Sequence, residues 1–216
     1  MANVKQQLDI PAIPSLGTSG IVYSQSLQNQ NNGLLRLFFT KLVNAIQSVI
    51  GPRGGKYLNN PYGAFQDSTD QVAANTTTAY AVTFNTTDFA NGVTMASGSR
   101  ITVADAVIWN LQFSIQLKNT TNDGQDVDIW FRKNGTNIAN SNSRFHPPPR
   151  KSSGDPSHII AALNFFVDMA ANDYVEIVWR TENTGVSIEH FGTSASPTRP
   201  AVPSAIVTMS FVSNIT

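Results

Sequence analysis

The sequence predicts a mainly β fold, an antiparallel jelly-roll sandwich preceded by an extended N-terminal arm and one α-helix. Between Val107 and Leu117 every odd position is apolar, and from Asn110 onward the even positions are polar. This period of two is typical of a strand with one buried and one solvated face. Many short strands separated by turns indicate a sandwich or jelly roll. Turn sequences occur at Asn91-Gly92, Asn122-Asp123-Gly124, Asn134-Gly135 and Asn172-Asp173.

Residues 1–33 are expected to form an extended arm. The segment Ile10-Pro11-Ala12-Ile13-Pro14 favours extended backbone, because a proline disfavours the α conformation in the residue before it. Residues 25–32 are a polar tract. The arm buries too little apolar surface to fold alone, so it is either a disordered tail or a peptide that becomes ordered on a partner.

Residues 34–50 are predicted to form a helix. Apolar residues spaced by four, three, four and three positions make a coiled-coil-like seam of Leu35, Phe39, Leu42, Ile46 and Val49. Gly51-Pro52 ends the helix. About two and a half heptads are marginal alone, which favours a bundle with sister chains or docking on another protein. Packing on the neighbouring domain of the same chain is the alternative.

A Gly/Pro-rich linker precedes Tyr62, where the period changes to that of β-strands. We therefore expect two parts, an anchoring or trimerisation region at 1–61 and a jelly-roll domain at 62–216. The predicted strands are residues 63–68, 78–85, 92–95, 100–103, 106–118, 126–133, 136–140, 157–168, 173–181, 185–192 and 205–211.

Several motifs of the β region occur in an order found in a known family. Tyr62-Gly63-Ala64-Phe65 is similar to an opening strand, and Phe131-Arg132-Lys133-Asn134-Gly135 to a hairpin with an Asn-Gly turn. Asn172-Asp173 occupies the place of a Gly-Asp turn before a Val-x-Leu strand. Together they resemble the jelly-roll domain of the tumour-necrosis-factor and complement globular-head superfamily. Ala106 and Asn172 replace the family's usual glycines.

Three further segments resemble domains in structural proteins of tailed phages. They are residues 130–135, 164–166 and 197–200. The resemblance implies a homotrimer that assembles through an aromatic and aliphatic face. It does not sort the aromatic residues between core and interface; the set comprises Trp109, Phe113, Trp130, Phe165, Tyr174, Trp179 and Phe211.

The composition argues against several classes of partner. Formal net charge is zero and 13% of residues are charged, so we expect no nucleic acid and no lipid surface as partner. The sequence contains no cysteine, no apolar run long enough for membrane insertion and no apolar segment after Lys5 that would suit a secretory signal.

No spacing of residues predicts catalysis, a metal site or a cofactor. His146, His158 and His190 lack the close spacing of metal ligands. The acidic cluster Asp123, Asp126 and Asp128 has the oxygen ligands that calcium prefers, but a solvated loop is the favoured interpretation. No serine lies in a Gly-x-Ser-x-Gly motif and no carboxylate pair stands out. We expect a protein that is not an enzyme.

The longest irregular stretch within the β region runs from residue 144 to 155. A long loop on a rigid sandwich is a candidate for recognition, and a solvent-exposed connection is the alternative. The candidate recognition residues are Arg144, His146, Arg150, Lys151 and Asp155.

The expected function is that of a tailed-phage virion protein, a capsid decoration protein or head fibre. Its N-terminal region would anchor it to other virion proteins. The alternative is a tail fibre or tail-tip protein that recognises host surface glycans. The chain contains no long fibrous shaft, which favours the head.

Overall fold

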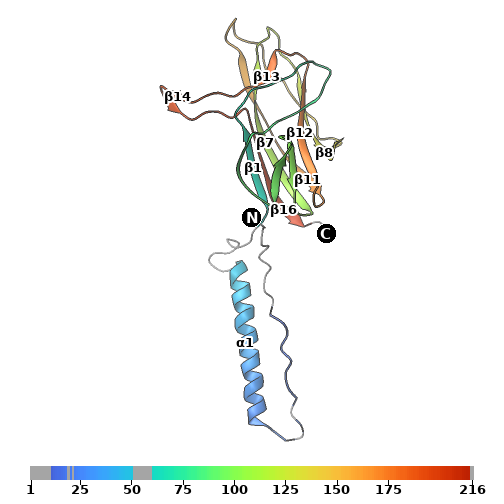
Figure 1. Cartoon of the computed structure of the whole chain (residues 1–216), viewed down its shortest axis with the longest axis vertical. Coiled ribbons are helices and arrows are strands. Elements are labelled where there is room, and N and C mark those ends of the chain that lie inside the picture. Colours follow the sequence, from blue (N-terminus) through green and yellow to red (C-terminus); the bar gives the residue numbers. More distant parts are fainter. Residues whose placement is uncertain (1–10, 19, 21, 51–59, 215–216) are drawn as a thin grey trace. The chain divides into compact units, whose positions relative to one another are not determined.

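The structure is a computed structural model of the 216-residue chain. It describes residues 11–18, 20, 22–50 and 60–214 (Figure 1). The chain divides into two units, Met1–Asn59 and Asn60–Thr216. The division falls within the segment that the sequence predicts as the linker, most of which lies outside the described residues.

Helix α1 spans Gln25–Ile50 and is longer than the sequence predicts. Ser24 is its N-terminal cap: the Ser24 hydroxyl accepts a hydrogen bond from the Leu27 N–H at 3.3 Å, and the Ser24 carbonyl accepts one from the Gln28 N–H at 3.0 Å. The prediction of an extended arm up to residue 33 is therefore wrong for residues 25–33. Apart from Leu27, the side chains of these first turns are polar and show no apolar period, so only the serine cap signals their helical state.

The described part of the arm is extended and contacts the beginning of the helix. The Gly17 N–H donates to Asn31 Oδ1 at 3.1 Å, and Asn31 Nδ2 donates to the Gly17 carbonyl at 2.9 Å. A Cβ on Gly17 would lie 2.7 Å from Leu27 Cδ1, so a larger residue here would displace the end of the Leu27 side chain.

The second unit is a sandwich of two antiparallel sheets, which confirms the predicted fold class. In the first sheet, β4, β1, β16, β7 and β11 are neighbours in that order, and β13 and β2 continue beside β7. The strands of this sheet are β1 Tyr62–Asp67, β2 Gln71–Val72, β4 Thr86–Asn91, β7 Val107–Asn119, β11 Ser157–Met169, β13 Val186–Ile188 and β16 Ala205–Asn214.

In the second sheet, β10, β8, β12, β6 and β5 are neighbours in that order, and β3 and β9 pair with β12 and β8. A separate hairpin of β14 and β15 extends away from both sheets (Figure 1). The strands are β3 Tyr80–Ala81, β5 Val93–Ala96, β6 Arg100–Val103, β8 Val127–Lys133, β9 Thr136–Asn137, β10 Ser143–Phe145, β12 Tyr174–Thr181, β14 Ser194–Ala195 and β15 Thr198–Arg199.

The predicted strands begin within one or two residues of observed strands. Several of them are shorter than predicted. Residues 78–85 form only the two-residue β3, and residues 185–192 contain only β13 as strand. Strands β2, β4, β10, β14 and β15 were not predicted. Thr86 to Ala90 of β4 are all exposed, so no alternation marks that strand in the sequence.

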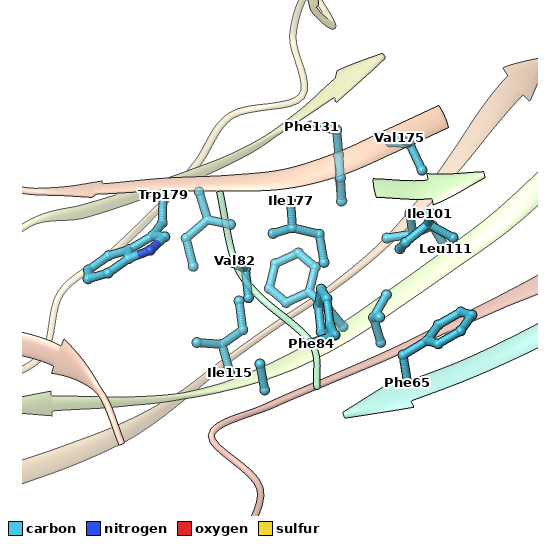
Figure 2. Packing of buried hydrophobic residues seen from close by; sticks show 14 of the residues in the cluster. Phe65, Val82, Phe84, Ile101, Leu111, Ile115, Phe131, Val175, Ile177 and Trp179 are labelled. Carbon is cyan, nitrogen blue, oxygen red and sulfur yellow. The ribbon is translucent and has the colours of Figure 1, made fainter. Parts of the chain in front are cut away.

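The core lies between the two sheets, and the odd positions of β7 point into it. Figure 2 shows Phe131, Ile177 and Trp179 of the second sheet facing Leu111 and Ile115 of the first. The ring of Phe131 stacks on Phe165 with centroids 4.8 Å apart. Among the aromatic residues that the sequence left unsorted, Trp109, Phe113 and Trp179 are core, whereas Trp130, Phe165, Tyr174 and Phe211 are half-buried.

Candidate interaction surfaces

The predicted recognition stretch begins inside a strand rather than in a loop. Arg144 lies in β10, and its Nε donates to Asp128 Oδ1 at 2.9 Å. Its Nη1 donates to Asp126 Oδ2 at 3.1 Å. Asp126 and Asp128 of the acidic cluster therefore belong to a salt-bridge network, and the interpretation of Asp128 as part of a solvated loop is wrong, because that side chain is buried.

Asp128 is the centre of this network. Arg180 Nη2 lies 2.9 Å from Asp128 Oδ2, and Asn142 Nδ2 donates to Asp128 Oδ1 at 3.3 Å. Burial alone would raise the pKa of the Asp128 carboxyl. The hydrogen bonds from Arg144 and Asn142, with the charges of Arg144 and Arg180, outweigh burial and lower the pKa from its ordinary value.

We expect Asp128 to contribute to a loss of stability in acid. Because its pKa is lowered in the folded state, the unfolded chain binds a proton at this carboxyl at a higher pH. The contribution is complete above the ordinary pKa of about 3.9 and is lost as the pH falls through the folded pKa. Asp128→Asn should therefore flatten the acid limb of the stability curve and lower the free energy of unfolding at neutral pH by roughly 1–3 kcal/mol, as measured by urea unfolding.

Asp155→Asn is the matched control for this prediction. Asp155 is exposed, and within the described residues its hydrogen bonds involve backbone atoms alone. Its replacement should leave the acid limb unchanged. An acid limb as steep in Asp128→Asn as in the unmodified protein would contradict the prediction.

His146 and Arg150 are also held by the fold. His146 Nδ1 lies 2.7 Å from Asp126 Oδ1, and a Cβ on Gly124 would overlap the histidine ring. Arg150 Nε donates to Asn122 Oδ1 at 2.8 Å. These contacts hold both side chains against one end of the sandwich, although the His146 side chain is 61% exposed.

Asn119 fixes the same stretch from inside the domain, and the sequence analysis missed this role. The side chain is fully buried at the end of β7. Its Nδ2 donates to the carbonyl oxygens of Asp123, Pro147 and Pro148 at 2.8, 3.3 and 2.9 Å. A signal was present, because asparagine occupies an inward, odd position of an otherwise apolar strand face.

Lys151 and Asp155 form the tip of the stretch and are exposed. The Lys151 N–H donates to the Asp155 carbonyl at 3.0 Å, and the Asp155 N–H donates to the Ser152 carbonyl at 3.1 Å. Among the described residues, neither charged side chain has a hydrogen-bond or ion-pair partner. The structure thus separates the five candidate residues into three that stabilise the fold and two that are available at a tip.

The outward side of the first sheet is a broad surface without charge in its centre. From Asn110 to Gln116 of β7, and opposite them on β11 and β16, every outward side chain is uncharged. We call this surface the uncharged face. Large apolar side chains are exposed on β1, β4, β11 and β16 of this sheet: Tyr62, Phe89, Ile160, Phe166, Ile206 and Val212.

Strand register joins these residues into rows across the uncharged face. Phe166 pairs with Asn110, Asn110 with Ser210 and Ser210 with Tyr62. The Tyr62 ring also packs edge-on against Phe89, with centroids 5.9 Å apart. Ile160 and Phe166 are 62% and 60% exposed, so the β unit leaves them uncovered.

Helix α1 also carries uncovered apolar side chains. Of the predicted seam, Phe39 and Ile46 are exposed, while Leu35 and Leu42 are half-buried. The side chain of Val49 lies outside the described residues. The helix therefore has an apolar stripe that the described residues bury only in part.

A pocket of about 300 Å³ opens on the outward side of the second sheet. Trp130 of β8 lies in its wall, and the indole Nε1 donates to Asn137 Oδ1 at 2.8 Å. No sequence pattern predicts this pocket, because its residues come from three strands and the segment that joins β9 to β10. The lining residues are Asp128, Trp130, Asn137, Ile138, Asn140, Asn142 and Arg180.

Comparisons with known proteins do not add a family to this description. No protein-family model matches the chain, and no curated protein matches it. The resemblance to jelly-roll domains of phage structural proteins therefore stays a prediction from the motifs.

Within the described ranges, no helix combines the length and hydropathy needed to cross a membrane. In that same part of the chain, no three His, Cys, Asp or Glu side chains lie together as a metal ion would require.

Proposed function

We propose that this protein is a non-enzymatic structural protein of a tailed-phage virion. In this proposal three copies assemble into a knob on the particle exterior. The N-terminal region attaches the knob to the shell, as in a capsid decoration protein or head fibre. The tie to tailed phages rests on the motifs at residues 130–135, 164–166 and 197–200.

The uncharged face is the observation that carries the proposal of assembly. A contiguous surface with exposed Phe89, Ile160 and Phe166 is typical of protein–protein contact. Interface cores are depleted of charge and enriched in aromatic residues, which matches the outward side of β7, β11 and β16. Because one sheet would be covered in the assembly, the second sheet would face outward.

The apolar stripe of helix α1 supports attachment. Phe39 and Ile46 are exposed on a helix that the described arm covers only in part. An amphipathic helix of this kind gains its stability from packing on a partner. A bundle of three sister helices and a groove on the shell are both compatible with the stripe.

A tail fibre or tail-tip protein that recognises host glycans is the second candidate function. Two observations favour it: the charged tip of Lys151 and Asp155, and the pocket beside Trp130 on the opposite sheet from the uncharged face. The same helix would then attach the protein to the tail.

Electron microscopy of particles that lack this chain tests the proposal. Loss of knobs from the shell is the expected result, and restoration by the intact gene is the control. Loss of a feature from the tail would select the second candidate. Particles of unchanged outline, together with absence of the chain from purified virions, would reject both.

A further inference from the structure

We propose that the Trp130 pocket binds a neutral pyranose unit of a glycan. The inference concerns the β unit alone and does not depend on trimer formation or on where the protein is displayed. It assigns a ligand class to a surface that the sequence motifs leave without a role.

Trp130 supplies an apolar platform in a fixed orientation. Its side chain is half-buried on the outward side of β8, where Trp130 pairs with Val178 of β12. The hydrogen bond from its Nε1 to Asn137 Oδ1 holds the indole in place before a ligand arrives. A pre-oriented aromatic ring stacks on the apolar face of a sugar ring with little loss of conformational entropy.

The polar atoms around this platform suit hydroxyl groups, each of which can donate and accept a hydrogen bond. Asn137 uses its Oδ1 for Trp130 and keeps its Nδ2 donors, while Asn142 uses its Nδ2 for Asp128 and keeps its Oδ1 acceptor. Within the described residues, the side chain of Asn140 makes no hydrogen bond. The pocket lining thus offers both free donors and free acceptors beside the tryptophan.

The charges of the pocket select a neutral ligand. Asp128 already accepts hydrogen bonds from Arg144, Arg180 and Asn142, so its carboxylate has little capacity left for a cation. The positive charges of Arg144 and Arg180 are in turn compensated by Asp126, Asp128 and Glu182. No excess of positive charge remains to favour a phosphate or another anion.

The pocket is of the right scale for one sugar ring. Its volume of about 300 Å³ is at the lower end of the range for small-molecule sites. It is open to solvent along the second sheet, so neighbouring units of a longer glycan would extend over the surface. Affinity for a single ring should therefore be weak and should rise with chain length.

The three tryptophans provide an internal control for a binding test. Trp109 and Trp179 are buried, whereas Trp130 is half-exposed. The full chain would be labelled with 5-fluorotryptophan, and its three fluorine resonances would be followed by NMR during titration. The probes are methyl β-D-galactopyranoside and methyl β-D-glucopyranoside, with the acyclic polyol sorbitol as a control. Trp130→Phe assigns the resonance.

The Trp130 resonance should shift in a saturable manner with at least one glycoside, while the other two stay in place. Asn140→Gly should weaken binding about fivefold or more, since it removes the unpaired amide. Glycine suits this position because the φ of Asn140 is 60°. Asn172→Gly is the matched control, because exposed Asn172 has a φ of 69° and lies outside the pocket.

Three results would overturn the inference. They are an unmoved Trp130 resonance with both glycosides, an equal shift with sorbitol, and equal affinity of Asn140→Gly and the unmodified chain. Each can be observed whether or not the protein is trimeric or part of a virion, so failure here is distinguishable from failure of the proposed function.

Discussion

Phe166→Asp is expected to convert the proposed trimer into monomers. Phe166 is 60% exposed on the outward side of β11, opposite the inward residues that fill the core. Burial of a phenylalanine contributes about 1.5–3 kcal/mol, and a trimer contains three copies. The change should therefore remove at least about 4 kcal/mol per trimer, a weakening of about a thousandfold.

Aspartate adds a second effect to the lost apolar contact. The centre of the uncharged face contains no cation with which the new carboxylate could pair on β7, β11 or β16. A charge buried without a partner costs several kcal/mol, so the assembled state becomes still less favourable. Light scattering coupled to size-exclusion chromatography, at micromolar concentration, measures the outcome.

Val72→Asp is the matched control for Phe166→Asp. Val72 is also a large exposed apolar residue, but it lies in the short strand β2, which pairs with β13 away from the centre of the face. This variant should remain trimeric. A monomeric unmodified protein, or a trimeric Phe166→Asp variant, would contradict the assignment of the uncharged face as an interface.

The strand that the sequence predicts best is the one whose two faces differ most. In β7 the inward Trp109, Leu111 and Phe113 alternate with the outward Asn110 and Gln112, and the alternation is visible without any structure. Strand β4 lies at an edge of the sheet, and its side chains from Thr86 to Ala90 are exposed. Its pairing with β1 therefore produces no recognisable residue pattern in the sequence. Alternation of polar and apolar residues arises where one face of a strand is buried, so a strand with no buried face cannot be predicted from it.

The candidate sites were harder to predict because they depend on register between distant strands. Asp128 contacts Arg144 and Arg180, which are 16 and 52 residues away in sequence. An acidic cluster looks solvated in sequence when its arginine partners lie elsewhere. The same reason hides the pocket, since Trp130 meets Asn140 only after the hairpin of β8 and β9 has formed.

Under the proposed attachment, Phe39→Asp combined with Ile46→Asp is expected to prevent incorporation of the protein into virions. Both residues are exposed on the same side of helix α1, seven residues apart. Loss of two buried apolar side chains should cost about 3–6 kcal/mol of attachment, which corresponds to at least about a hundredfold in affinity. The measurement is the amount of the chain that co-purifies with particles when the variant complements a deletion.

Gln30→Asp combined with Asn44→Asp is the control, because it adds the same charge to exposed polar positions on the opposite side of the helix. This control variant should enter virions at the unmodified level. The thermal midpoint of the β unit should be the same in both variants, since the helix belongs to the other unit of the chain. Normal incorporation of the Phe39→Asp, Ile46→Asp variant would mean that the apolar stripe does not attach the protein. The arm before Ser24 would then be the next candidate, because its own apolar residues Ile13, Leu16 and Val22 are exposed as well.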